Sequence, residues 1–283
     1  MTLLSATLSF AHACGEVVTI PTHGNTTTRY AFASPPDAKG TLVLLAGGGG
    51  HLDLDDKGCP RALTGNSLAR SMPHFHALGF ATALVDAPSD YPGDDGLGGF
   101  RIAADHADDL GIVIADVRVR AKVPVWLIGT SRGSISAANA AARLSGPAAA
   151  DGVVLTSALM YGNRGQKLWV TQTLFDVTLE SILPVLVIGH AEDKCLRSPP
   201  DQMDRITART NGSCEQVAGV GCARRTRYKA ERCAVRTLPR SRHLPPQPLA
   251  NPAPHHPFFI FGLEPRRIVQ PHINLAPIRR RRA

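Results

Sequence analysis

The sequence predicts an α/β fold with a mostly parallel sheet, flanked by helices and followed by an irregular C-terminal tail. From Glu16 onward, short β-rich runs alternate with segments of helical periodicity, as in a chain that returns to one sheet through crossover helices. Several runs are apolar on both faces, as strands covered by helices must be. The 283 residues, 43% of them hydrophobic, are enough for one such domain with a substantial core.

The elements follow from local patterns. The predicted strands are apolar, β-rich runs bounded by turn residues, and they span residues 17–21, 29–33, 41–46, 81–86, 124–128, 152–156 and 184–189. The predicted crossover helices carry apolar residues at helical spacing and span residues 66–78, 101–120 and 132–144. Residues 161–180 follow neither pattern, and we expect them to cover either the sheet edge or the functional site.

The composition of the chain changes at about residue 208. Residues 209–283 hold 15 Lys/Arg and 3 Asp/Glu, whereas residues 1–208 hold 16 and 20, so the net charge of +8 arises in the tail. The tail also holds 10 of the 22 prolines, which break helices and central strands. We therefore expect a folded core over residues 16–208 and a poorly ordered tail over residues 209–283.

The Arg-rich tail has two explanations that the sequence leaves open. It is either a basic arm for an anionic partner, with a cluster of arginines at 279–282, or the out-of-frame translation of a GC-rich gene, which yields Arg, Pro and Ala. A shift of one nucleotide at Pro239 and Arg240 would read His-Gly if their codons are CCA and CGG. The tail lacks the interleaved aromatic residues that stack on bases, so a nucleic-acid partner is not favoured.

The first 15 residues also have two explanations. Residues 1–13 are apolar and end in a small-x-small sequence typical of signal-peptide cleavage, but they lack a basic n-region. They are either a truncated signal peptide or an ordinary first strand. A signal peptide would make the protein secreted or periplasmic and allow disulfides, and a cytoplasmic location is the alternative. We expect one disulfide to join Cys195 to Cys214, Cys222 or Cys233.

Several classes of protein are excluded or disfavoured. No stretch reaches the roughly 18 consecutive apolar residues of a membrane-spanning helix, so we predict no membrane span. The cysteines show no paired CxxC spacing, and no metal site or nucleotide cofactor is indicated. The sequence does not predict the oligomeric state.

The strongest chemical signal is the pentapeptide Gly129-Thr130-Ser131-Arg132-Gly133, which follows an apolar strand and precedes an Ala-rich helix. The G-x-S-x-G pattern alone recurs by chance, but strand, sharp turn and helix in this order are what a nucleophile elbow requires. Ser131 is the candidate nucleophile, and an ordinary Gly-rich turn is the alternative. The backbone N–H of Arg132 would donate to an oxyanion, while its side chain forms a structural salt bridge.

Two further loops supply candidate partners for Ser131. Four consecutive glycines follow the third predicted strand, and the amides of Gly47 and Gly48 are candidates for the second side of an oxyanion hole. A flexible turn or a phosphate loop is the alternative, although the Gly-Lys-Ser/Thr ending of a P-loop is missing. Asp193 follows a buried strand and is the candidate orienting acid, with Glu192 in reserve and a solvated turn residue as the alternative.

With these motifs, residues 41–200 resemble the α/β-hydrolase family, in its esterase or dienelactone-hydrolase type. The resemblance implies a triad of Ser131, Asp193 and a later histidine, and hydrolysis of an ester, thioester or small amide through an acyl-enzyme without a cofactor. The sequence departs from the family after Arg209, where no further strand, His-Gly pair or closing helix is legible.

His243 is the candidate base because it lies about 50 residues after Asp193, although it precedes Leu244-Pro245-Pro246. We assign the earlier His51, His106 and His190 to loop or core packing. If the usual histidine region is lost, catalysis is impaired. The alternative function is therefore an inactive α/β-hydrolase-like domain that acts as a binding module with a basic tail.

Overall fold

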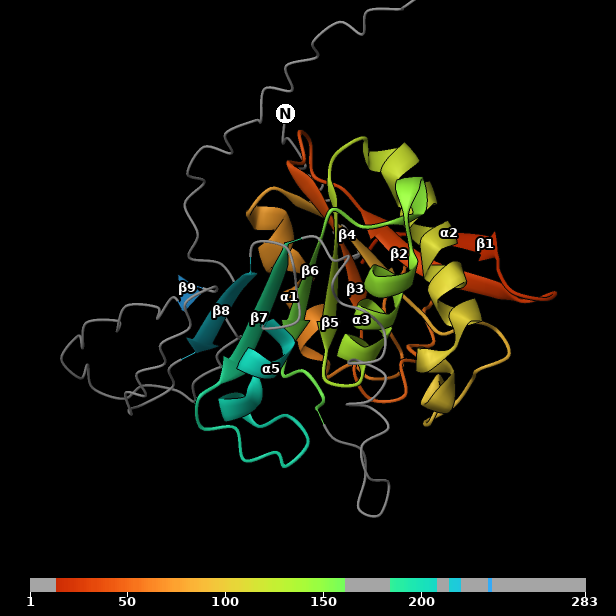
Figure 1. Ribbon diagram of the computed structural model, residues 1–283. Helices are drawn as coiled ribbons and strands as arrows, with labels where there is room; N and C mark the ends of the chain where they lie inside the picture. The colour runs from red at the N-terminus through yellow and green to blue at the C-terminus, as the bar shows by residue number, and fades with distance from the viewer. Residues whose placement is uncertain (1–13, 161–183, 208–213, 220–233, 236–283) are drawn as a thin grey trace, which may run out of the picture.

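The computed structural model describes residues 14–160, 184–207, 214–219 and 234–235, and within these residues nine strands form one sheet (Figure 1). The strand order is β1-β2-β4-β3-β5-β6-β7-β8-β9. The pairs β1–β2 and β2–β4 are antiparallel, and all the others are parallel. The strands are β1 (Glu16–Pro21), β2 (Thr27–Ala33), β3 (Gly40–Leu45), β4 (Phe80–Val85), β5 (Val125–Thr130), β6 (Gly152–Thr156), β7 (Val185–His190), β8 (Cys214–Gly219) and β9 (Ala234–Val235).

Strands β1 to β7 lie within two residues of their predicted bounds at either end. No strand is legible in the sequence after Arg209, yet β8 and β9 extend the parallel sheet beyond β7. The residues of β8 read Cys-Glu-Gln-Val-Ala-Gly, which is neither an apolar run nor a clean alternation. Its pairing with β7 therefore depends on tertiary context and not on a local pattern.

Helices cover both faces of the sheet (Figure 1). Helices α2 (Ala104–Ala121), α3 (Gly133–Arg143) and α5 (Asp204–Thr207) contribute to a core on one face, which contains Leu110, Val113, Val117, Ala137 and Ile206. Helix α1 (Ser67–Ala77) packs on the other face through Leu68, Met72 and Phe75. Among the described residues, no helix is both long enough and apolar enough to cross a membrane.

The helix boundaries have local causes. The side chain of Asn66 accepts a hydrogen bond from the amide of Leu68 and caps α1. Helix α2 begins three residues later than predicted, because Gly98–Ile102 forms a separate 3₁₀ helix that contains Arg101. It ends where Lys122 adopts a left-handed conformation with φ 54°.

One disulfide lies within the described residues, and it joins Cys14 to Cys59. The backbone amide of Cys14 donates to the carbonyl of Lys57, which places the start of β1 beside this loop. Cys195 is a free, exposed thiol, so the expected pairing with a later cysteine is wrong. The spacing of cysteines does not determine their connectivity, because the pairs are set by the tertiary fold.

The disulfide closes a loop between residues 45 positions apart, and it restricts the unfolded chain more than the folded one. Reduction with dithiothreitol should lower the free energy of unfolding by about 2 to 4 kcal/mol. Urea titration of the oxidised and reduced protein measures this difference. The Cys59→Ser variant is the control, because its stability should not respond to the reductant; equal stability of the oxidised and reduced wild type would contradict the expectation.

A second long-range link joins the β1–β2 turn to α2. His23 lies between two carboxylates, with Nδ1 2.6 Å from Asp109 and Nε2 3.1 Å from Asp90. Its ring also lies 4.8 Å from the ring of Phe100, centroid to centroid. Burial lowers the pKa of His23, but the hydrogen bonds and negative charges of Asp109 and Asp90 raise it more, so the net pKa is raised.

A raised folded-state pKa means that protonated His23 stabilises the fold fully below the unfolded pKa of about 6.5, and that this contribution is lost as the pH rises through the folded value. The His23→Gln variant should therefore lose more stability relative to wild type at pH 6 than at pH 9. Chemical denaturation of both proteins across this range measures the difference. A destabilisation that does not vary with pH would contradict the assigned charge.

Candidate active site

The candidate residues gather at the carboxyl edge of the parallel strands. The four glycines follow β3, Ser131 follows β5, and Asp193 follows β7. The chain leaves β3 for β4 on one side and later enters β5 on the other, so β3 and β5 flank the switch point of the sheet. In open α/β sheets, ligands bind outside the carboxyl ends of the strands at such a point.

Ser131 occupies a strained turn between β5 and α3. Its φ is 51°, a left-handed conformation that few non-glycine residues adopt. Neighbouring groups hold the turn: the amide of Ser131 donates to the carbonyl of Thr156 at 3.0 Å, and the carbonyl of Ser131 accepts from the Ser134 hydroxyl at 2.6 Å. The strain is therefore sustained by the ends of β6 and α3.

The two glycines of the pentapeptide are required by close backbone contacts. A Cβ on Gly129 would lie 2.4 Å from the carbonyl oxygen of Gly133, and a Cβ on Gly133 would lie 2.1 Å from that of Leu45. Both distances are far below van der Waals contact. The turn therefore packs directly against the last residue of β3, and this contact sets the separation between the two loops.

The glycine loop lies against Ser131. A Cβ on Gly47 would lie 3.1 Å from the Ser131 Cβ and 3.7 Å from its Oγ. Within the described part of the chain, the amides of Gly47, Gly48 and Arg132 donate to no protein acceptor. Helix α3 begins with no side-chain cap, although the amides of Ser134 and Ile135 donate to the carbonyls of Ser131 and Arg132. The amides of Gly47, Gly48 and Arg132 suit an oxyanion.

Two buried charged residues, neither of them among the predicted site residues, hold the glycine loop and the residues that follow it. Asp86, at the end of β4, accepts hydrogen bonds from the amides of Leu52 and Leu54 at 2.6 and 3.1 Å. Arg101 donates to the carbonyls of Ala46 and Gly48 at 3.2 and 3.3 Å. Burial lowers the pKa of Arg101, and the nearby positive charge of Arg132 lowers it further. No short-range motif marks either residue.

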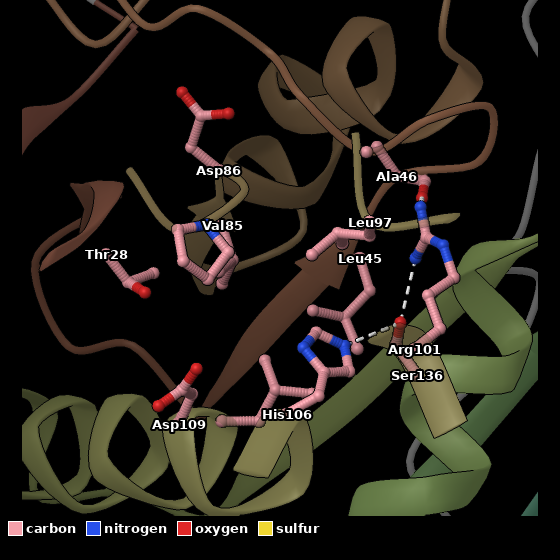
Figure 2. A pocket seen from close by; sticks show the side chains of 13 residues that line it. Thr28, Leu45, Ala46, Val85, Asp86, Leu97, Arg101, His106, Asp109 and Ser136 are labelled. Atoms are coloured by element: carbon pink, nitrogen blue, oxygen red, sulfur yellow. Dashed lines mark hydrogen bonds between the residues drawn. The ribbon is translucent and has the colours of Figure 1, made fainter. Parts of the chain in front are cut away.

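Figure 2 shows how Arg101 connects to α3. The guanidinium donates to the hydroxyl of Ser136 at 2.8 Å, and Nε2 of His106 lies 2.8 Å from the same oxygen. The ring of His106 is buried, and burial together with the charge of Arg101 lowers its pKa to about 3. His106 is thus a neutral core residue, as predicted. A cavity of about 20 Å³ adjoins it, large enough for a single water molecule.

The other predicted side chains occupy loops. Arg132 forms an ion pair with Asp95 at 3.0 Å, which confirms the predicted salt bridge of its side chain. His51 accepts from the amide of Gly93, and His190 accepts from the amide of Glu192, an exposed residue.

Asp193 is half-buried and organises its own turn. Its two carboxylate oxygens accept from the amide of Cys195 at 2.9 Å and from the hydroxyl of Ser198 at 3.1 Å. A carboxylate has about four acceptor positions, so the turn leaves room for one more donor. His243, the candidate base, lies outside the described residues.

The sequence matches no family model, and no curated protein matches it. The fold is similar to those of solved structures. A soluble variant of monoglyceride lipase from Saccharomyces cerevisiae, bound to a substrate analogue, aligns over 73% of this chain and 86% of its own, with a TM-score of 0.52 and 11% identity. A lipase/esterase from Lactobacillus plantarum aligns over 73% and 89%, with a TM-score of 0.51 and 12% identity. The predicted α/β-hydrolase fold is confirmed.

The close contact at Gly133 yields a test of the turn. Gly133→Ala should lower the free energy of unfolding by about 2 kcal/mol or more, because the new methyl group would force the backbone of β3 and the turn apart. Thermal or urea unfolding measures the loss. Gly65→Ala is the matched control: no atom lies within 4 Å of its Cβ, and a change within about 0.5 kcal/mol is expected. Equal effects in both variants would contradict the packing argument.

Proposed function

We propose that this protein is a serine hydrolase that cleaves a carboxylic ester through an acyl-enzyme on Ser131. The observation that carries the proposal is the conformation of Ser131, a non-glycine residue at φ 51° between β5 and α3. Strain of this kind persists only where the surrounding structure holds it, and it lifts the serine hydroxyl above the sheet as a nucleophile elbow does. The solved structures of similar fold are named as a lipase and a lipase/esterase, which agrees with an ester substrate.

The chemistry begins with attack of the Ser131 oxygen on the ester carbonyl carbon while a histidine accepts its proton. The carbonyl oxygen becomes an oxyanion, and the amides of Gly47, Gly48 and Arg132 donate to it. These amides have no protein acceptor among the described residues, so they are available when the negative charge develops. The tetrahedral intermediate then collapses, the alcohol leaves with the proton from the histidine, and water hydrolyses the acyl-enzyme by the reverse sequence.

Asp193 and His243 complete the proposed triad. Asp193 lies two strands from Ser131 along the sheet and accepts the N–H of the base at a position that its turn leaves unused. His243 acts as the base. Because Leu244-Pro245-Pro246 follow it and offer no helix to anchor the imidazole, we expect the base to be poorly held and turnover to be slow.

Replacement of the nucleophile tests the proposal. Ser131→Ala should abolish hydrolysis of p-nitrophenyl acetate and labelling by a fluorophosphonate probe, because both need the serine oxygen. Ser145→Ala, which removes an exposed hydroxyl just after α3, is the control and should behave as wild type. Undiminished turnover in Ser131→Ala would refute the proposal, and absence of both labelling and turnover in wild type would favour the inactive binding module.

A further inference from the structure

Among the residues that the structure describes, the buried cation of Arg101 has no ion-pair partner. Its side chain is 1% exposed, and none of the ion pairs among the described residues includes it. The partners of the guanidinium are three neutral oxygens, belonging to Ala46, Gly48 and Ser136. A buried charge in this situation is unfavourable for stability, and an apolar side chain of similar volume would pack there at less cost. Stability alone does not explain an arginine at this position.

The three acceptors belong to the two elements that carry the proposed oxyanion donors. Ala46 and Gly48 lie in the glycine loop after β3, and Ser136 lies on α3, directly after the Ser131 turn. Figure 2 shows the guanidinium between the Ala46 carbonyl and the Ser136 hydroxyl. One rigid side chain therefore fixes the glycine loop relative to the helix that begins beside Ser131.

The hydrogen bond to the Ala46 carbonyl also fixes the direction of the Gly47 amide. In a trans peptide unit, the carbonyl and the following N–H point in opposite directions. The Ala46 carbonyl is held toward Arg101, so the Gly47 N–H is turned away from the guanidinium. Arg101 also packs against Gly50, because a Cβ at Gly50 would lie only 2.5 Å from a terminal nitrogen of the guanidinium. The loop is therefore held by contact as well as by hydrogen bonds.

We propose that Arg101 is a positioning residue that orients the amides of the glycine loop for the oxyanion and sets their separation from the Arg132 amide. The inference deepens the proposed function and rests on it. Arg101 acts through the loop and does not itself contact the substrate. Lysine cannot replace it, because a single ammonium group lacks the planar fork that reaches three acceptors on two elements.

Two variants test the inference in the full-length chain. Arg101→Met removes the charge and the fork, and Arg101→Lys keeps the charge alone. For p-nitrophenyl acetate we expect kcat to fall roughly 100-fold in Arg101→Met and at least about tenfold in Arg101→Lys, with KM within about threefold of wild type. Inhibition by phenylboronic acid, whose tetrahedral serine adduct mimics the oxyanion, should weaken by the same factor as kcat/KM. Circular dichroism should show both variants folded; if Arg101→Met does not fold, Arg101→Lys decides.

A second readout does not depend on activity. Amide hydrogen exchange in the peptide that covers residues 45–52 should be faster in both variants than in wild type, while peptides from β1 and β2 are unchanged. Arg118→Met is the matched control: Arg118, on α2, donates to Asp151 and to the Ala149 carbonyl, and its loss should leave kcat and the exchange of residues 45–52 unchanged.

The possible outcomes distinguish a failure of the positioning role of Arg101 from a failure of the proposed function. Wild-type kcat and wild-type exchange in the Arg101 variants would overturn the positioning role, as would a rise in KM with kcat unchanged. A wild-type protein that neither hydrolyses the ester nor binds the boronic acid would refute the proposed function instead. In that case the oxyanion role of Arg101 falls with the function, and the exchange measurement decides only whether Arg101 holds the glycine loop.

Discussion

The approach of the β5–α3 turn to the end of β3 is the constraint on which the candidate site depends. Gly133 leaves no room for a side chain between α3 and the Leu45 carbonyl, so the helix lies as near to the strand as backbone atoms allow. That distance brings Ser131 against Gly47 and places the start of α3 beside the glycine loop. A longer side chain at either glycine of the pentapeptide would separate the parts before any chemistry could begin.

Close packing also explains how the strain at Ser131 is sustained. A left-handed serine costs of the order of 1 to 3 kcal/mol, and it persists only where several contacts oppose its relaxation. Here the Ser131 amide is bound to the end of β6, and its carbonyl is bound to Ser134. The Ser134 hydroxyl in turn accepts from the amide of Leu159, so the turn is tied to the chain after β6 as well. Packing of the sheet core therefore offsets the free-energy cost of the strained turn.

Features encoded by neighbouring residues were predictable, and features encoded by distant contacts were not. The strands β1 to β7 and the Ser131 turn follow from periodicity and from glycines at fixed spacing, both of which operate over a few residues. The disulfide, strand β8 and the role of Arg101 depend on partners that the fold brings from elsewhere in the chain. Arg101 carries no local signal of its role, because it lies at the start of a segment with helical periodicity, where an arginine is usually exposed.

The buried carboxylates and the buried arginine near the site differ in how their charges are compensated. Asp109 is compensated by His23, and Asp86 is compensated by backbone amides, so each stabilises the loop to which it is bound. Among the described residues, Arg101 hydrogen-bonds only to carbonyl and hydroxyl oxygens, which repay the loss of hydration less fully than a carboxylate, and Asp95, whose charge favours its ionised form, is ion-paired with Arg132 instead. A carboxylate beside it would neutralise the guanidinium, but it would also place a negative charge next to the proposed oxyanion and oppose the charge that the site has to stabilise. An unpaired cation is therefore the electrostatically consistent way to hold this loop.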